Sequence, residues 1–241
     1  MSRAVAVIPV FNELPTARAV VKRALEQLPQ VIVVDDGSTD GTSASLEGLP
    51  ITLIRNPRNL GKAASLWRGI AIALAEDAEA VVTLDGDGQH RPEDIPRLLE
   101  VHRRDREALV VGARLHDRSR IPAERYLANR FGNFLVAWAA GQRVEDSQSG
   151  FRVYPAELLR ALPSRMERVA SFVFESEVLI EAGRRGTRLE WVRIPAIYES
   201  QARPSHFRPV VDFLLIGRMI LWKLLSRGFY LRGLLRSLRG A

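Results

Sequence analysis

The chain of 241 residues contains no cysteine. This absence excludes disulfides, thiol nucleophiles and cysteine-ligated metals, and it fits a reducing compartment. Apolar runs are also short, and none approaches the roughly 18 residues that a transmembrane helix needs. A strand-like pattern begins directly after Met1, Ser2 and Arg3, so we expect no secretory signal peptide. We therefore expect a cytoplasmic protein with one large domain, or with a domain and an appendage.

Acidic residues are almost absent from the C-terminal end. Residues 201–241 contain eight basic side chains and one acid, Asp212, so the net charge of +7 resides there. Between residues 210 and 238, arginines are spaced among leucines and aromatic residues. This pattern predicts an amphipathic helix in a membrane interface, with Arg and Lys reaching the lipid headgroups. Packing on the domain or on a second subunit, as in a homodimer, is the alternative, whereas nucleic-acid binding would favour a solvated basic face without so large an apolar stripe.

Short apolar runs alternate with helical patterns along most of the chain. The runs have the length and composition of buried strands. This order predicts an α/β, Rossmann-like fold with a mostly parallel sheet covered by helices on both faces. We expect this domain over residues 1–208 and a basic helical tail over 209–241. Strands are expected at 4–10, 31–34, 51–54, 81–84, 109–111 and within 187–198, and helices at 14–28, 62–76, 92–104, 126–140 and 172–182.

Two carboxylates separated by one glycine, Asp85 and Asp87, follow the strand expected at 81–84, and Gln89 comes two residues later. Alternation along an extended chain would point the three side chains the same way. Oxygen ligands of this kind suit Mg²⁺ or Mn²⁺. An acidic turn without a ligand is the simpler interpretation of an isolated Asp-Gly-Asp. However, ligands of parallel sheets bind beyond the carboxyl ends of the strands, where these residues lie.

Four motifs in a fixed order extend the metal-site interpretation. Residues 8–13 (IPVFNE), 33–42 (VVDDGSTDGT), 59–62 (NLGK) and 84–90 (LDGDGQH) together resemble family 2 glycosyltransferases of the GT-A fold. Within that family, the chain is most similar to polyprenyl-phosphate sugar transferases of the dolichol-phosphate-mannose synthase type. The resemblance covers about residues 4–208, and several independent motifs carry it.

The resemblance implies a site for a GDP- or UDP-linked sugar. Pro9, Phe11 and Glu13 would line the base and ribose, and Asp36 would hydrogen-bond the base. Phe11 stands where the family usually has tyrosine, so stacking on the ring is retained and a hydroxyl contact is lost. Lys62 would contact the diphosphate.

The same resemblance implies the catalytic residues. Asp85, Asp87 and Gln89 would hold the Mg²⁺ or Mn²⁺ that bridges the diphosphate, so Asp85 belongs to the nucleotide site and Asp87 is needed for catalysis. A cation there neutralises charge on the leaving group. Asp146, in residues 145–152 (EDSQSGFR), would lie near the reacting sugar carbon. It is the general base if the acceptor is a hydroxyl, whereas it would orient acceptor or sugar if the acceptor is an anionic phosphate.

Polar side chains in the second half are implied to bind the phosphate of a lipid acceptor. Guanidinium groups suit a phosphate that must be held and yet stay nucleophilic. The acceptor residues implied are Arg114, Arg125, Asn129, Gln148, Arg203 and Arg208. Glu175 and Glu177 lie on the helix expected at 172–182, and the sequence does not separate a supporting role in the site from a structural one.

These features predict transfer of one sugar to a polyprenyl or dolichyl phosphate at the cytoplasmic membrane face, with the protein bound peripherally. The family implies inversion at the sugar carbon, and the absent Gln-x-x-Arg-Trp signature of processive synthases favours a single transfer. Transfer to a hydroxyl of another lipid or glycan, with Asp146 as base, is an alternative. A nucleotidyltransferase is a second, although its usual glycine- and lysine-rich loop is missing. A catalytically idle membrane scaffold is a third, against which the three intact metal ligands argue.

Overall fold

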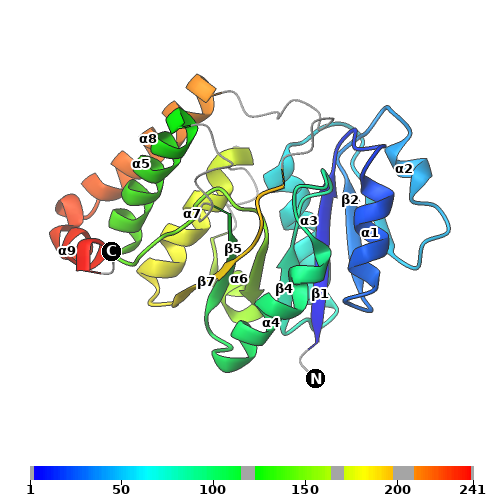
Figure 1. The fold of residues 1–241 in the computed structure, drawn as a ribbon, viewed down its shortest axis with the longest axis horizontal. Helices are drawn as coiled ribbons and strands as arrows, with labels where there is room; N and C mark the ends of the chain where they lie inside the picture. The colour runs from blue at the N-terminus through cyan, green and yellow to red at the C-terminus, as the bar shows by residue number, and fades with distance from the viewer. Residues whose placement is uncertain (1–2, 115–122, 164–170, 198–208, 240–241) are drawn as a thin grey trace.

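A computed structural model describes residues 3–114, 123–163, 171–197 and 209–239. These residues form a 7-stranded sheet with the order β3-β2-β1-β4-β6-β5-β7 (Figure 1). Neighbouring strands run parallel, except that β6 is antiparallel to β4 and β5. The strands are β1 (Ala4–Val10), β2 (Val31–Asp35), β3 (Thr52–Arg55), β4 (Ala80–Thr83), β5 (Leu109–Ala113), β6 (Arg152–Pro155) and β7 (Leu189–Arg193). The predicted mostly parallel α/β sheet is confirmed.

Helices cover both faces of this sheet (Figure 1). Side chains of α1 and α4 pack with Ala6 and Ile8 of β1, whereas side chains of α3, α5, α7 and α8 pack with Val5 and Val7 on the other face. Because alternate β1 side chains enter different core layers, the strand is apolar throughout. The helices are α1 (Ala17–Leu25), α2 (Thr42–Ser45), α3 (Lys62–Ala75), α4 (Ile95–Arg104), α5 (Ala123–Ala140), α6 (Ala156–Ala161), α7 (Ser171–Arg184), α8 (Pro209–Leu225) and α9 (Leu231–Arg239), with 3₁₀ turns η1 (Pro92–Asp94) and η4 (Gly228–Tyr230).

Within residues 1–208, the sequence-based prediction needs correction at three points. The helix expected from residue 14 begins only at Ala17, because the backbone N–H groups of Thr16 and Ala17 both bond to the carbonyl of Glu13 in a turn. β4 ends at Thr83, and Gly88 has a φ of 79°, so the segment carrying the two aspartates is a turn. The argument from strand alternation was therefore wrong, although it does not decide whether these residues bind a metal.

The third correction is β6, which the sequence did not predict. Its segment begins with an arginine and ends with a proline, which are unusual bounds for a central strand. Arg152 is nevertheless fully buried, because its guanidinium donates to the carbonyls of Ser147, Ser149 and Glu175 at 2.7–3.0 Å. The antiparallel strand thereby brings the segment before it to the carboxyl end of β4, where Thr83 Oγ1 donates to the carbonyl of Gly150.

The C-terminal helices α8 and α9 lie against α5 and α7 at one end of the molecule (Figure 1). Ile216, Ile220 and Leu224 of α8 enter the same core layer as α3 and α7. Lys223 is also buried, and its Nζ lies 3.0 Å from Glu177 and forms a second ion pair with Glu181. The expectation that this lysine reaches lipid headgroups is therefore wrong. Among the described residues, no helix has the length and hydropathy needed to cross a membrane.

Candidate active site

The polar motifs meet at the carboxyl ends of β1, β2 and β4. Asn12 joins the first two motifs: its backbone N–H donates to Ser38 Oγ, and its Oδ1 accepts from the backbone N–H of Thr39, both at 2.8 Å. Thr16 Oγ1 donates to the carbonyl of Gly86 at 2.7 Å, which fixes the aspartate turn beside the start of α1. Side-chain bonds to loop backbones therefore assemble one polar edge from three separate segments.

Lys62 connects the start of α3 to this edge. Its Nζ lies 2.6 Å from Asp85 Oδ1 and 2.9 Å from Glu175 Oε1 on α7. Burial by itself would lower the pKa of Lys62, but the negative charges of Asp85 and Glu175 raise it above the usual value. Burial would conversely raise the pKa of Asp85, yet the Lys62 charge lowers it to about 2. Lys62 and Asp85 are thus both charged at neutral pH.

Asp87 has the opposite electrostatic environment. Burial and the neighbouring charge of Asp85 raise its pKa to about 6. Two mutually repelling carboxylates at a partly buried edge favour a cation, and an all-oxygen donor set fits Mg²⁺ or Mn²⁺. No three His, Cys, Asp or Glu side chains gather at metal-binding spacing within the described ranges. A cation at Asp85 and Asp87 would therefore need a ligand of another kind, such as the Gln89 amide or phosphate oxygens.

His90 is buried next to the aspartate turn and supports it. It is 1% exposed, and its ring lies 5.4 Å from that of Phe151. Burial lowers its pKa to about 4, so the imidazole is neutral at neutral pH. Its Nδ1 accepts from the backbone N–H of Asp85 at 3.4 Å. The histidine therefore helps to hold the loop and adds no positive charge that would oppose a cation.

Asp36 holds the loop that precedes α3 through hydrogen bonds. It is 3% exposed, and its carboxylate accepts from the backbone N–H groups of Leu60 and Gly61 at 2.9 Å and from the amide of Asn56 at 2.8 Å. These bonds fix the turn that leads into α3 and so position Lys62. The contact of Asp36 with a base stays a prediction.

The acceptor-side motif is built around Asp146, which is 1% exposed. Its Oδ2 accepts from Nε and the backbone N–H of Arg114 at 3.0 and 3.1 Å, and its Oδ1 accepts from Nη2 of Arg114 at 3.4 Å and from the backbone N–H of Gln148 at 3.2 Å. Burial would raise the pKa of Asp146, but the Arg114 charge and these bonds hold it below the usual range. The two residues form one charged unit beyond β5.

The neighbouring side chains frame this unit. Asn133 of α5 accepts from the N–H and Oγ of Ser147 at 2.9 and 2.7 Å, and its amide donates to the carbonyl of Glu145. Gln148 Nε2 donates to Ser176 Oγ of α7 at 3.1 Å. Asn129, which is partly exposed, lies one turn before Asn133 on α5 and therefore near the same face.

For the remaining predicted site residues, the structure gives the burial of three and does not describe the side chains of the others. Pro9 is buried within β1, and Phe11 and Glu13 are partly buried just beyond its end. Arg203 and Arg208 lie outside the described residues, as does the side chain of Arg125, whose backbone belongs to α5. The nucleotide and acceptor roles of all these residues stay predictions.

Sequence reasoning missed Glu175 as a partner of Lys62 and Asn133 as a partner of the acceptor motif. Periodicity placed Glu175 on a helix, but its partner comes from α3, and no local spacing signals that contact. The one available signal was chemical: several acids, Glu175, Glu177 and Glu181, stand among the apolar residues of an amphipathic helix. Acids on a buried face require partners, and these have them.

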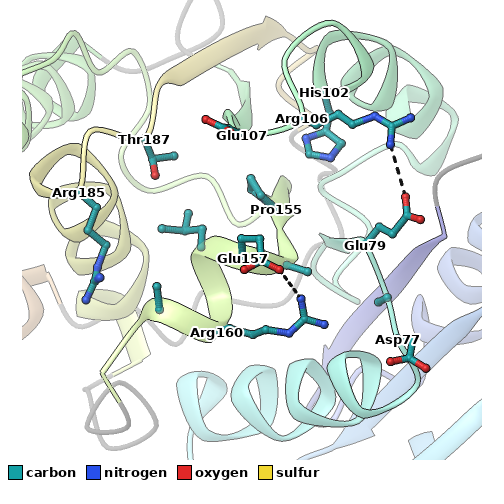
Figure 2. Close-up of a pocket in the computed structure, with 14 residues that line it drawn as sticks. Asp77, Glu79, His102, Arg106, Glu107, Pro155, Glu157, Arg160, Arg185 and Thr187 are labelled. Carbon is teal, nitrogen blue, oxygen red and sulfur yellow. Dashed lines mark hydrogen bonds and ion pairs between the residues drawn. The ribbon is translucent and has the colours of Figure 1, made fainter.

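A hollow of about 550 Å³ lies at the opposite edge of the sheet (Figure 2). Its lining includes Glu79 before β4, Glu107 before β5 and Thr187 before β7, so it opens at the amino ends of these strands. Glu157 and Arg160 of α6 form an ion pair at 2.8 Å along one side of it. Arg106 and Glu79 form a second ion pair there at 3.8 Å, and the hollow is remote from every motif described above.

Comparison with known proteins agrees with this arrangement. The family described as "Glycosyl transferase family 2" matches residues 5–162. A UDP-N-acetylglucosamine–dolichyl-phosphate N-acetylglucosaminyltransferase of Methanococcus voltae is 26% identical, over 90% of this chain and 95% of its own length. An undecaprenyl-phosphate mannosyltransferase of Micrococcus luteus is also 26% identical, over 81% of this chain and 83% of its own.

A solved structure shares the fold. Glucosyl-3-phosphoglycerate synthase from Mycobacterium tuberculosis, crystallised with Mn²⁺, UDP and glucosyl-3-phosphoglycerate, superimposes with a TM-score of 0.68. It is 22% identical in sequence, and the match covers 94% of this chain and 80% of that one. The family match extends over most of the sheet and over every motif from β1 to β6. The chain belongs to glycosyltransferase family 2 and is a glycosyltransferase.

Proposed function

We propose that this glycosyltransferase moves a single sugar from a nucleoside-diphosphate sugar to the phosphate of a polyprenyl or dolichyl lipid. The hydrogen bonding and the pKa of Asp146 favour a phosphate acceptor over a hydroxyl acceptor. Both of its oxygens accept hydrogen bonds, and its pKa is held below the usual range by Arg114 despite burial. A general base works best with an accessible lone pair and a pKa near the working pH. A phosphate acceptor is already anionic and does not require such a base.

The relatives support this acceptor class. The Methanococcus voltae and Micrococcus luteus proteins are named for transfer to dolichyl phosphate and undecaprenyl phosphate, and both align with most of this chain. Their names give two different sugars, so the sugar of this enzyme is left to experiment.

The donor would lie along the edge formed by β1, β2 and β4. Phe11 offers a ring for stacking, and Lys62 offers a positive charge to the diphosphate. Asp85, Asp87 and Gln89 would hold Mg²⁺ or Mn²⁺, which neutralises negative charge on the leaving diphosphate when bound. The low pKa of Asp85 and the repulsion that raises the pKa of Asp87 both favour a cation at this place.

The acceptor phosphate would approach from the side of Arg114. One of its oxygens attacks the anomeric carbon, the bond from that carbon to the diphosphate breaks, and the nucleoside diphosphate leaves. Attack from the opposite face inverts the configuration at that carbon. Asp146 holds the Arg114 guanidinium through Nε and Nη2, so this residue would orient the positive charge that receives the acceptor.

A membrane-embedded acceptor requires a protein surface that meets the membrane, and the C-terminal helices fit that need. Residues 213–239 contain no acid. Leucines spaced as i, i+4 and i+7 stand exposed along α9 at Leu231, Leu235 and Leu238, beside the exposed Arg232 and Arg236. On α8, Trp222 is 67% exposed. Apolar stripes flanked by arginines favour an anionic lipid surface, so we propose peripheral attachment at the cytoplasmic face.

A transfer assay tests this function. Purified protein with Mn²⁺ or Mg²⁺ is offered radiolabelled UDP- and GDP-sugars together with a polyprenyl phosphate. Polyprenol of the same chain length is the matched acceptor with a hydroxyl, and Asp87→Ala is the control enzyme. We expect label in an acid-labile lipid from the phosphate acceptor alone, and none with the variant.

Other results would change the function. Label on polyprenol instead would identify a hydroxyl acceptor and make Asp146 the base. Metal-dependent hydrolysis of one donor without lipid labelling would retain a glycosyltransferase with another acceptor. If no donor is turned over and no nucleotide binds with metal, the proposed reaction is wrong.

A further inference from the structure

Lys62 stands between two carboxylates, and one of them belongs to no motif of the site. Its Nζ contacts Asp85 Oδ1 at 2.6 Å from the aspartate turn and Glu175 Oε1 at 2.9 Å from α7. We propose that Glu175 is a positioning residue that competes with Asp85 for Lys62 and thereby leaves the Asp85 carboxylate available to a divalent cation. This inference rests on the metal site of the proposed function.

A lysine and a divalent cation compete for the same carboxylate oxygens. If Asp85 were the sole partner of Lys62, their charge-assisted bond would have to be given up whenever a cation bound. The lysine would then stand partly buried beside a dication, which is electrostatically unfavourable. A second carboxylate at hydrogen-bond distance keeps the ammonium group paired when a cation binds the first one.

Glu175 is suited to that exchange. Its side chain is 4% exposed, so water competes little for it. Its Oε2 is buried and has no hydrogen-bond partner within the part of the chain that the structure describes. An ammonium group has three donors, so this oxygen can accept a further Lys62 N–H when Asp85 is withdrawn. A buried carboxylate oxygen without a partner is costly, and the exchange would relieve that cost.

Two hydrogen bonds hold this part of α7 in place. Its carbonyl accepts from Nη1 of the fully buried Arg152 at 2.8 Å, and the next residue, Ser176, accepts from Gln148. A Cβ at Gly150 would lie 2.9 Å from both Lys62 Nζ and Asp85 Oδ2. The lysine is therefore enclosed between the aspartate turn, α7 and the backbone of the acceptor motif, so small movements of Nζ transfer it between its two carboxylates.

The same helix provides a comparison. Glu177 is also buried and paired with a lysine, but its partner is Lys223 of α8, away from the aspartate turn. If Glu175 served only to stabilise the fold, its replacement would resemble that of Glu177. If it positions Lys62, its replacement alters cation binding.

The experiment measures Mn²⁺ affinity without nucleotide, by electron paramagnetic resonance of free Mn²⁺, for the wild type and for Glu175→Gln, Lys62→Met, the double variant and Glu177→Gln. We expect Glu175→Gln to weaken Mn²⁺ binding about tenfold or more, as other residues behind metal ligands do. We expect Lys62→Met to tighten Mn²⁺ binding about tenfold more in the Glu175→Gln protein than in the wild type. Without the Glu175 carboxylate, Lys62 competes more strongly with the cation for Asp85, so the effects of the two substitutions are not additive. Glu177→Gln should bind Mn²⁺ as the wild type does.

Each outcome decides between roles. Equal effects of Lys62→Met in both backgrounds would mean that Glu175 acts only as a distant charge, and unchanged Mn²⁺ binding in Glu175→Gln would make it structural. Either result would overturn this inference and leave the proposed transfer reaction intact. If the wild type binds no Mn²⁺ alone, the series is repeated with UDP and with GDP, because phosphate oxygens can complete the cation's ligands. Failure of the wild type to bind Mn²⁺ with either nucleotide would overturn the inference together with the metal site. Melting temperatures of all variants show whether the folded fraction is matched.

Discussion

The polar edge at the carboxyl ends of β1, β2 and β4, together with the Arg114–Asp146 pair, is the region that we propose to be catalytic and here call the catalytic edge. This edge and the C-terminal helices hold their polar groups in opposite ways. At the catalytic edge, loop backbones and side chains bind one another repeatedly: Asp36 alone accepts three internal donors, and Asp146 is fixed by Arg114 and Gln148. On α8 and α9, Arg218, Arg232 and Arg236 are exposed among exposed leucines, whereas Lys223 is buried. Precise chemistry needs many fixed bonds, whereas contact with a fluid lipid surface needs only a face of suitable composition.

Helix α7 belongs to both regions. Glu175 at one end of its acidic stretch contacts Lys62 in the catalytic edge, and Glu177 and Glu181 contact Lys223 of the C-terminal helix α8. The two regions therefore share a structural element while they differ in how their charges are satisfied. Substitutions on either side test whether the two regions differ in this way.

The largest effect is expected at the catalytic edge. Asp87→Ala should reduce sugar transfer by about 10³-fold or more, because it removes charge stabilisation of the leaving diphosphate. The measurement is initial rate at saturating donor and Mn²⁺. Asp77→Asn is the matched control: Asp77 lies by the hollow of Figure 2 at the other edge, and its φ of 57° is tolerated by asparagine. Equal losses in both variants would contradict a metal-holding role for Asp87.

The next effect concerns stability in the C-terminal region. Lys223→Met leaves Glu177 and Glu181 buried without their shared cation, which should lower the free energy of unfolding by about 3–5 kcal/mol. Chemical denaturation followed by circular dichroism measures the change. Arg218→Met, on the exposed part of the same helix, should change stability by less than about 0.5 kcal/mol. Similar values for both would show that the buried ion pairs do not attach α8 to α7.

The sequence predicted the catalytic edge better than the contacts behind it. Apolar strands ending in polar motifs are local patterns, so β1, β2 and β4 and their motifs could be located from spacing alone. β6 could not, because Arg152 and Pro155 are unfavourable strand residues that only the tertiary structure satisfies. The role of Glu175 depends on a contact between α7 and α3, and the burial of Lys223 depends on one between α7 and α8. Neither contact is encoded by neighbouring residues.

A smaller effect is expected for membrane contact. Replacing Trp222 and Leu225 of α8 together by serine removes exposed apolar surface without touching the core residues Ile220 and Leu224. Binding to vesicles of anionic phospholipid should weaken about tenfold, since partial insertion of such side chains contributes free energy in proportion to area. Flotation through a density gradient measures it, with zwitterionic vesicles as the comparison. Unchanged flotation with a shift from dimer to monomer in sedimentation would instead assign this surface to a second subunit.

The smallest expected effect is the pH dependence of stability that His102 contributes. His102 lines the hollow of Figure 2, which is remote from both regions. His102 is 3% exposed, and burial lowers its pKa, although its Nδ1 lies 3.4 Å from the carbonyl oxygen of Ala108. Because the unfolded chain binds a proton at His102 near pH 6.5 and the folded chain does so only at lower pH, the free energy of unfolding should fall as pH is lowered below about 6.5. Neutral His90 contributes a change of the same sign, so the test is the difference between the wild type and His102→Gln. Denaturant midpoints between about pH 7.5 and pH 5 should fall less steeply in the variant, and parallel profiles would mean that His102 takes up its proton alike in both states.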